Sequence, residues 1–132
     1  MGLLKKLQIK KGYSVAVLNA PEGFSLPKEE FPEGARLIDR PEGELDTILL
    51  FAKDSGDLKQ FAADVTNYLK DDGLLWVAYP KKSSKIKSDI SRDQGWDVLQ
   101  EKGYEGVSLV SVDEKWSAFR FRERKYIKSL NK

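Results

Sequence analysis

The sequence predicts an α/β fold with one open sheet that is mostly parallel and ends in an antiparallel hairpin. Two segments, 46–52 (DTILLFA) and 74–79 (LLWVAY), are apolar throughout, which is typical of parallel strands covered on both faces. A segment with helical periodicity separates them. The last two apolar segments, 106–112 and 116–122, are joined by only three residues. A parallel return would need about a dozen or more, so these two strands must be antiparallel.

Size and composition are those of a small globular protein. The chain has 132 residues, of which 40% are hydrophobic and 33% are charged, so we expect a single domain, 1–132, with a basic tail from about 123 to 132. The net charge of +2 is too small to indicate a partner. The sequence contains no Cys and no His, which excludes disulfides, thiolate or imidazole metal ligands, and catalysis by either residue. We therefore expect no metal and no cofactor.

The first half predicts two strands joined without a long helix. Segment 13–20 (YSVAVLNA) is a short, β-branched apolar run that ends at the turn sequence PEG. Segment 35–39 (ARLID) fits a short second strand. Pro27 and Pro32 lie between them, and proline in a helix interior removes a hydrogen bond and clashes with the preceding turn.

The helix between the two fully apolar strands has one apolar stripe, which consists of Leu58, Phe61, Ala62, Val65 and Leu69. Their spacing follows the helical period, so the stripe should face the sheet. Asp54 or Ser55 can cap the start of this helix, and Gly73 can end it.

A second helix is predicted after segment 79–96. Ser91 and Gln94 have the spacing of a capping box, and Gly103 can close the helix. Trp96 and Leu99 lie three residues apart on its apolar face.

Further expectations concern the burial of the three tryptophans and the two faces of the last strand. We expect Trp76 and Trp96 to be buried, and Trp116, at the start of the last strand, to be the tryptophan with the best chance of exposure. Phe119 and Phe121 should share one face of that strand, opposite Arg120 and Arg122.

Several stretches resemble the second half of the methyltransferase-like Rossmann fold. LDTILLFA, LKDDGLLWVAYP and YEGVSLVSVDEKWSAFRF follow the ending of that fold over about residues 45–122. The resemblance implies the strand order two, one, three, four, six, five. More narrowly, VLNAPEGF, LLWVAYPKKSS and VSVDEKWSAFRFR look like a family of small bacterial proteins known only as a domain of unknown function. That likeness supplies no catalytic residue.

The first half departs from the methyltransferase pattern. The resemblance implies a glycine-rich loop after the first strand, but this chain has NAPEGF, where Gly23 is the only glycine and Pro21 lacks a backbone N–H. Asp39 follows the second predicted strand and is a candidate for the acid that binds a ribose. A lone Asp before RPEGE is also an ordinary turn residue.

The candidate site is a lysine- and serine-rich loop in segment 79–96 (YPKKSSKIKSDISRDQGW). Ligands of open α/β sheets bind beyond the carboxyl ends of the strands, near the switch in strand order. A helix start at about 88–91 would add backbone N–H donors for an anion. The candidate ligand-binding residues are Asn19, Lys53, Lys81, Lys82, Ser83, Ser84, Lys85 and Ser88. The alternative is a flexible loop whose charges only keep the protein in solution.

Positive charge is concentrated in three segments, 1–20, 81–92 and 116–132, which folding can merge into one patch or leave scattered. The function we predict is a non-catalytic binding or interaction domain with an anionic ligand as its candidate. The alternatives are a reduced methyltransferase-like enzyme that binds S-adenosylmethionine or a nucleotide, and a weak nucleic-acid binder. No apolar run approaches the roughly 20 residues of a membrane span, so we expect a cytoplasmic protein without membrane association.

Overall fold

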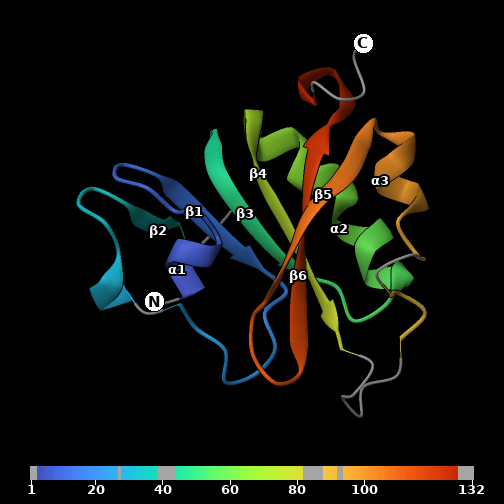
Figure 1. Ribbon diagram of the computed structural model, residues 1–132, viewed down its shortest axis with the longest axis horizontal. Coiled ribbons are helices and arrows are strands. Elements are labelled where there is room, and N and C mark those ends of the chain that lie inside the picture. The colour runs from blue at the N-terminus through green and yellow to red at the C-terminus, as the bar shows by residue number, and fades with distance from the viewer. Residues whose placement is uncertain (1–2, 27, 39–43, 82–87, 92–93, 128–132) are drawn as a thin grey trace.

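The structure, a computed structural model, describes residues 3–26, 28–38, 44–81, 88–91 and 94–127 (Figure 1). Its elements are α1 (Leu3–Lys6), β1 (Ser14–Leu18), the 3-10 helix η1 (Lys28–Glu30), β2 (Arg36–Ile38), β3 (Leu45–Phe51), α2 (Ser55–Tyr68), β4 (Leu69–Pro80), α3 (Asp97–Glu101), β5 (Tyr104–Ser111), β6 (Trp116–Glu123) and the 3-10 helix η2 (Arg124–Tyr126). Within this described part, no helix combines the length and the apolar character that crossing a bilayer requires.

The strands form one six-stranded sheet in the order β2-β1-β3-β4-β6-β5. The pairs β1–β2, β1–β3 and β3–β4 are parallel, whereas β4–β6 and β5–β6 are antiparallel. The predicted α/β fold, its strand order and its final hairpin are therefore confirmed. The strand order switches direction between β1 and β3, because β2 lies on one side of β1 and β3 on the other.

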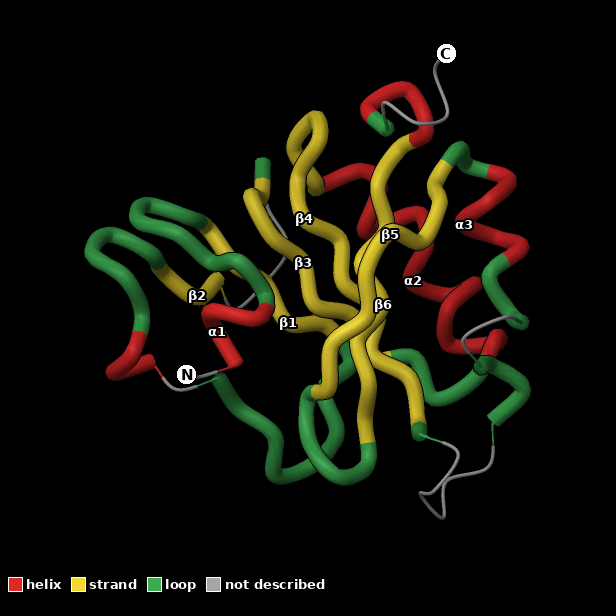
Figure 2. Tube along the Cα trace, viewed as in Figure 1, coloured by secondary structure: helices red, strands yellow, loops and turns green. Residues whose placement is uncertain are grey.

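Each face of the sheet carries its own hydrophobic core. Helices α2 and α3 lie together over one face and contribute Leu58, Val65 and Leu99 to its core (Figures 1 and 2). Over the other face, which we call the α1 face, α1 and the chain that follows it contribute Leu4 and Leu7. Residues 47–51 of β3 and 74–80 of β4 are buried between these layers, which explains why these parts of the two central strands are almost entirely apolar.

Helix α2 begins where the sequence predicts but ends earlier. Asp54 is the N-cap, and its Oδ1 accepts a hydrogen bond from the Asp57 backbone N at 3.0 Å. The predicted end at Gly73 is wrong, because the helix ends at Tyr68 and Gly73 lies inside β4. Leu69, which the helical periodicity assigned to the helix, instead belongs to β4 and pairs with Leu45 at the start of β3.

The region before α3 also differs from the prediction. Ser91 and Gln94 do not form a capping box, since their backbones form a bridge in which Ser91 N donates to Gln94 O at 3.1 Å. The helix begins only at Asp97, after Gly95, which has a φ of 95° in the left-handed region. The predicted helix start at 88–91 is therefore wrong. The predicted end at Gly103 is confirmed, because Gly103 follows the C-cap and has a φ of 93°.

The three tryptophans are all buried. Trp76 and Trp96 are in the core, as expected, but the expected exposure of Trp116 is wrong. Its ring packs edge-on against Phe51, with 5.1 Å between the ring centroids. Phe119 and Phe121 lie on the opposite face of β6, as predicted, where both rings pack against Trp96.

Candidate ligand site at the carboxyl edge of the sheet

Asn19 joins the ends of β1 and β3 at the switch in strand order. It has a φ of 56°, and its side-chain Nδ2 donates to the Phe51 carbonyl at 2.8 Å and to Asp57 Oδ2 at 3.2 Å. The backbone N of Lys53 donates to the same Asp57 oxygen at 3.1 Å. The sequence correctly placed Asn19 and Lys53 at one edge, but here the Asn19 amide links two loops of the protein itself.

Asp57, which organises this junction, was not among the predicted site residues. Its position three residues after the N-cap Asp54 is the signal that could have found it, because an acid at that place often bonds back to the backbone before a helix.

The start of α2 is occupied by another carboxylate of the chain. Asp89 Oδ1 accepts a hydrogen bond from the Ser55 backbone N at 2.8 Å, and Asp89 Oδ2 accepts one from the Ser55 hydroxyl. The hydrogen bonds from the Ser55 hydroxyl and backbone hold the pKa of Asp89 below its ordinary value. An anion therefore does lie at a helix start on this edge, but the helix is α2 and the anion belongs to the segment after β4.

Asp89→Asn is expected to weaken this link. Because the pKa of Asp89 is lower in the folded state, its contribution to stability is present above the unfolded pKa and is lost as the pH falls through the folded one. We expect faster amide hydrogen exchange at Ser55 in the variant, and loss of the acidic titration of the Ser55 amide shift. Asp71→Asn, at an exposed position of β4, is the matched control and should change neither. A wild-type Ser55 amide shift that does not follow a carboxyl pKa in acid would contradict the assignment.

Lys81 and Ser88 are the described ends of the lysine-rich loop. Lys81 is directed toward the β5–β6 hairpin, because its backbone N donates to the Lys115 carbonyl at 2.8 Å and its Nζ to Ser111 Oγ at 2.7 Å. Ser88 is exposed, and its hydroxyl accepts a hydrogen bond from the Ile90 N at 3.0 Å. Lys82, Ser83, Ser84 and Lys85 lie outside the described residues, as does Asp39, so their roles stay predictions.

A pocket of about 500 Å³ lies at this edge of the sheet. It lies between residues 21–25, which follow β1, and residues 113–116 of the hairpin. Phe24 and Trp116 contribute aromatic surface, and each packs on Phe51. The sequence prediction missed this pocket because its two walls are far apart along the chain.

The charged side chains around the pocket are Glu22, Asp113, Glu114 and Lys115, all of them exposed. Asp113 Oδ1 is already engaged, since it accepts hydrogen bonds from the backbone N atoms of Lys115 and Trp116 at 2.8 and 2.9 Å. Among the described residues, no group of three or more carboxylates is placed to hold a metal ion.

Solved structures with a similar fold include methyltransferases and an RNA-processing protein. A SAM-dependent methyltransferase from Aquifex aeolicus aligns with a TM-score of 0.61 and 17% identity over 90% of this chain and 86% of that one. The Methanococcus jannaschii fibrillarin pre-rRNA processing protein aligns with a TM-score of 0.56 and 14% identity, covering 87% and 68%. The B. subtilis M1A22 tRNA methyltransferase TrmK gives 0.53 and 10%, covering 91% and 64%. At such identities the likeness shows the fold alone.

Comparison with curated protein sequences gave no significant match. One family model matches residues 30–125, which is well over half of the chain, and its description is "Protein of unknown function (DUF3052)". The chain therefore belongs to the DUF3052 family of proteins of unknown function.

Proposed function

We propose that this chain is a non-catalytic binding domain that takes a small ligand in the pocket at the carboxyl edge of its sheet. The observation that carries the proposal is the pocket of about 500 Å³ between residues 21–25 and 113–116, with Phe24 and Trp116 in its wall. Its volume suits a small organic molecule, and its position agrees with the general location of ligand sites in open α/β sheets. The aromatic surface favours a ligand with a flat, apolar body.

The charges around the pocket restrict where the anionic group of the ligand can lie. The exposed acids Glu22 and Glu114 repel an anion, so the anionic group would face the side of Lys115 and Lys81. The Lys115 carbonyl accepts the backbone hydrogen bond of Lys81, which keeps the two residues together beside the pocket. We therefore propose a ligand whose body is neutral and whose charge lies at one end.

A nucleoside and its monophosphate, used as probes, test the neutral body and the charged end of the proposed ligand separately. In NMR titrations, adenosine and adenosine monophosphate should both shift the amides of residues 22–25 and 113–116, and the monophosphate should bind more tightly. Lys115→Glu should weaken the monophosphate by on the order of threefold, because one exposed charge pair contributes up to about 1 kcal/mol. Glu114→Lys should strengthen it, and the matched control Lys102→Glu, on an exposed residue after α3, should not change it.

Two further variants locate the ligand. Ser25→Trp places a large ring at the pocket wall and should abolish binding of both probes. Lys82→Ala and Lys85→Ala test the lysine-rich segment and should weaken only the anionic probe. If neither probe shifts the pocket amides more than the rest of the surface, the proposed function is wrong.

A methyltransferase-like enzyme is the second candidate, and the shared fold favours it. The described residues at the switch in strand order do not fit S-adenosylmethionine, however. The Asn19 side chain is engaged in hydrogen bonds to Phe51 and Asp57, and Pro21 supplies no backbone donor. Between β1 and β2, the described residues form the short helix η1 and no α-helix.

We accordingly expect no tight binding of S-adenosylmethionine. Isothermal calorimetry on the purified chain should detect no binding with a dissociation constant of about 10 micromolar or less, which corresponds to a binding free energy of roughly −7 kcal/mol. An amide spectrum recorded on the same sample shows that the protein is folded. A low-micromolar affinity would disprove the expectation and make the enzyme the leading candidate.

A further inference from the structure

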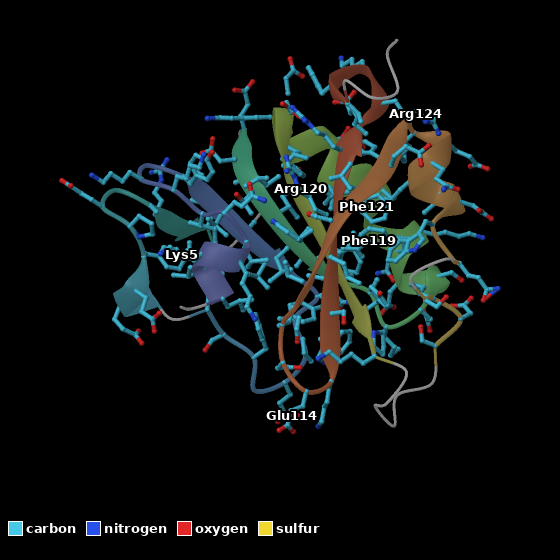
Figure 3. All side chains as sticks on the ribbon, viewed as in Figure 1. Lys5, Glu114, Phe119, Arg120, Phe121 and Arg124 are labelled. Atoms are coloured by element: carbon cyan, nitrogen blue, oxygen red, sulfur yellow. The ribbon has the colours of Figure 1, made fainter. Side chains whose placement is uncertain are left out.

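Arg120, in the middle of β6, lies on the α1 face between two neighbouring strands (Figure 3). It is the register partner of Trp76 on β4 and of Ser108 on β5. Directly opposed residues of antiparallel strands lie about 5 Å apart and project to the same side. Trp76 belongs to the core of the α1 face, so Arg120 and Ser108 project to that side as well.

Arg120 and Ser108 each have a buried polar atom that lacks a partner. Within the described residues, neither Arg120 Nε nor Ser108 Oγ has a hydrogen-bond partner. The next arginines along the chain are paired: Arg122 makes two hydrogen bonds of 2.7 Å to Asp72, and Arg124 makes one of 2.7 Å to Glu105. Buried donors without a partner are rare in folded proteins, and a missing water or ion is a common reason for them.

The electrostatic surroundings leave the charge of Arg120 poorly compensated. Burial, and after it the nearby charge of Arg122, lowers the pKa of Arg120, while Asp72 and Tyr13 act in the opposite direction. Asp72 is already bonded to Arg122 through both carboxylate oxygens. A half-buried guanidinium in this position favours an anion as its missing partner.

Basic residues from the chain start add to this surface. Lys6 on α1 reaches β5, where its Nζ lies 3.4 Å from the Ser111 carbonyl. Lys6, from the basic segment 1–20, therefore lies beside the strand that carries Ser108. Its charge adds to that of Arg120 and raises the local concentration of small anions.

We propose that Arg120 and Ser108 form a binding site for a small oxyanion, a phosphate or carboxylate group. The guanidinium supplies charge-assisted N–H donors and the serine supplies a hydroxyl donor, and both turn toward the anion when it enters. This Arg120–Ser108 site is separate from the pocket at the carboxyl edge. Three residues of β6 lie between Trp116 and Arg120, which are therefore about 13 Å apart along the strand.

The experiment is an NMR titration with inorganic phosphate, and separately with acetate, at constant ionic strength. We expect a saturable shift of the Arg120 Nε–H signal and of the Ser108 amide, with a dissociation constant on the order of 1–10 mM. A stronger response to phosphate than to acetate identifies a tetrahedral anion, and the reverse identifies a carboxylate. The pocket amides, 22–25 and 113–116, report on the proposed function independently in the same spectra.

Three variants decide the assignment. Ser108→Ala should weaken binding about fivefold through the loss of one hydrogen bond. Arg120→Gln should abolish it, and if that variant does not fold, Arg120→Lys should show weakened binding because it keeps the charge without the planar donors. Arg124→Gln, the matched control, should bind phosphate as the wild type does. A linear, unsaturated shift at Arg120, or equal shifts at Arg122 and Arg124, would overturn the proposal and assign the two buried donors to water.

Discussion

Replacing Trp76 with Ala is expected to lower the free energy of unfolding by about 3–5 kcal/mol. Trp76 is only 1% exposed, in the central strand β4, and it fills the core of the α1 face. Its Nε1 donates to the Leu7 carbonyl at 3.1 Å, so the ring also anchors the chain that follows α1. Denaturant unfolding followed by circular dichroism measures the loss.

Trp76→Phe separates the hydrogen bond from the packing. This variant keeps most of the apolar volume but leaves the buried Leu7 carbonyl without its donor, which costs about 1–3 kcal/mol. We also expect faster exchange of amides in residues 4–9 in both variants. If Trp76→Ala cost no more than a typical surface substitution, within about 0.5 kcal/mol, the buried position of β4 would be wrong.

Replacing Trp96 with Ala is expected to cost a similar 3–5 kcal/mol and also to loosen the candidate ligand edge. The ring is 4% exposed and lies in an aromatic cluster, 4.9 Å from Phe121 and 5.4 Å from Tyr79 between ring centroids. Its Nε1 donates to the Ser91 carbonyl at 2.9 Å. Since Asp89 lies close to Ser91 in the chain, loss of this anchor should also weaken the bond between Asp89 and Ser55.

Two measurements test these consequences together. Denaturant unfolding gives the change in stability, and amide exchange at Ser55 gives the change at the start of α2. Phe121→Ala is the matched control, because it empties the same cluster, at 1% exposure, without removing the hydrogen bond to Ser91. Both variants should lose stability, but Trp96→Ala should accelerate exchange at Ser55 more. Equal acceleration in the two would show that Trp96 does not anchor this segment.

Local patterns were sufficient to predict most of the architecture. Short continuous apolar runs identified the two central strands, because a strand covered on both faces has no position that faces solvent. The short connection between β5 and β6 required an antiparallel pair, since a parallel return would need about a dozen residues or more. The strand order came from the resemblance to a known fold, and the structure has the same order.

Element ends and the burial of single side chains depended on contacts between distant residues. Helix α2 ends at Tyr68 because Leu69 pairs with Leu45. Helical periodicity cannot predict this pairing, because it reflects only the spacing of residues along one segment. Helix α3 begins late because the Ser91–Gln94 bridge and Gly95 precede it. Trp116 is buried because Phe51, from another strand, lies beneath it.

For the candidate sites too, the sequence predicted some features and only the tertiary structure revealed the others. The sequence by itself placed Asn19, Lys53 and Lys81 at one edge, because parallel strands end on the same side of a sheet. Only the tertiary structure showed that Asn19 bonds to Phe51 and Asp57, and that residues 21–25 and 113–116 form the walls of a pocket. It alone placed Arg120 opposite Ser108, because strand register is set by the packing of the whole sheet. These placements bring together groups that lie far apart in the chain, and no local pattern records which of them will meet.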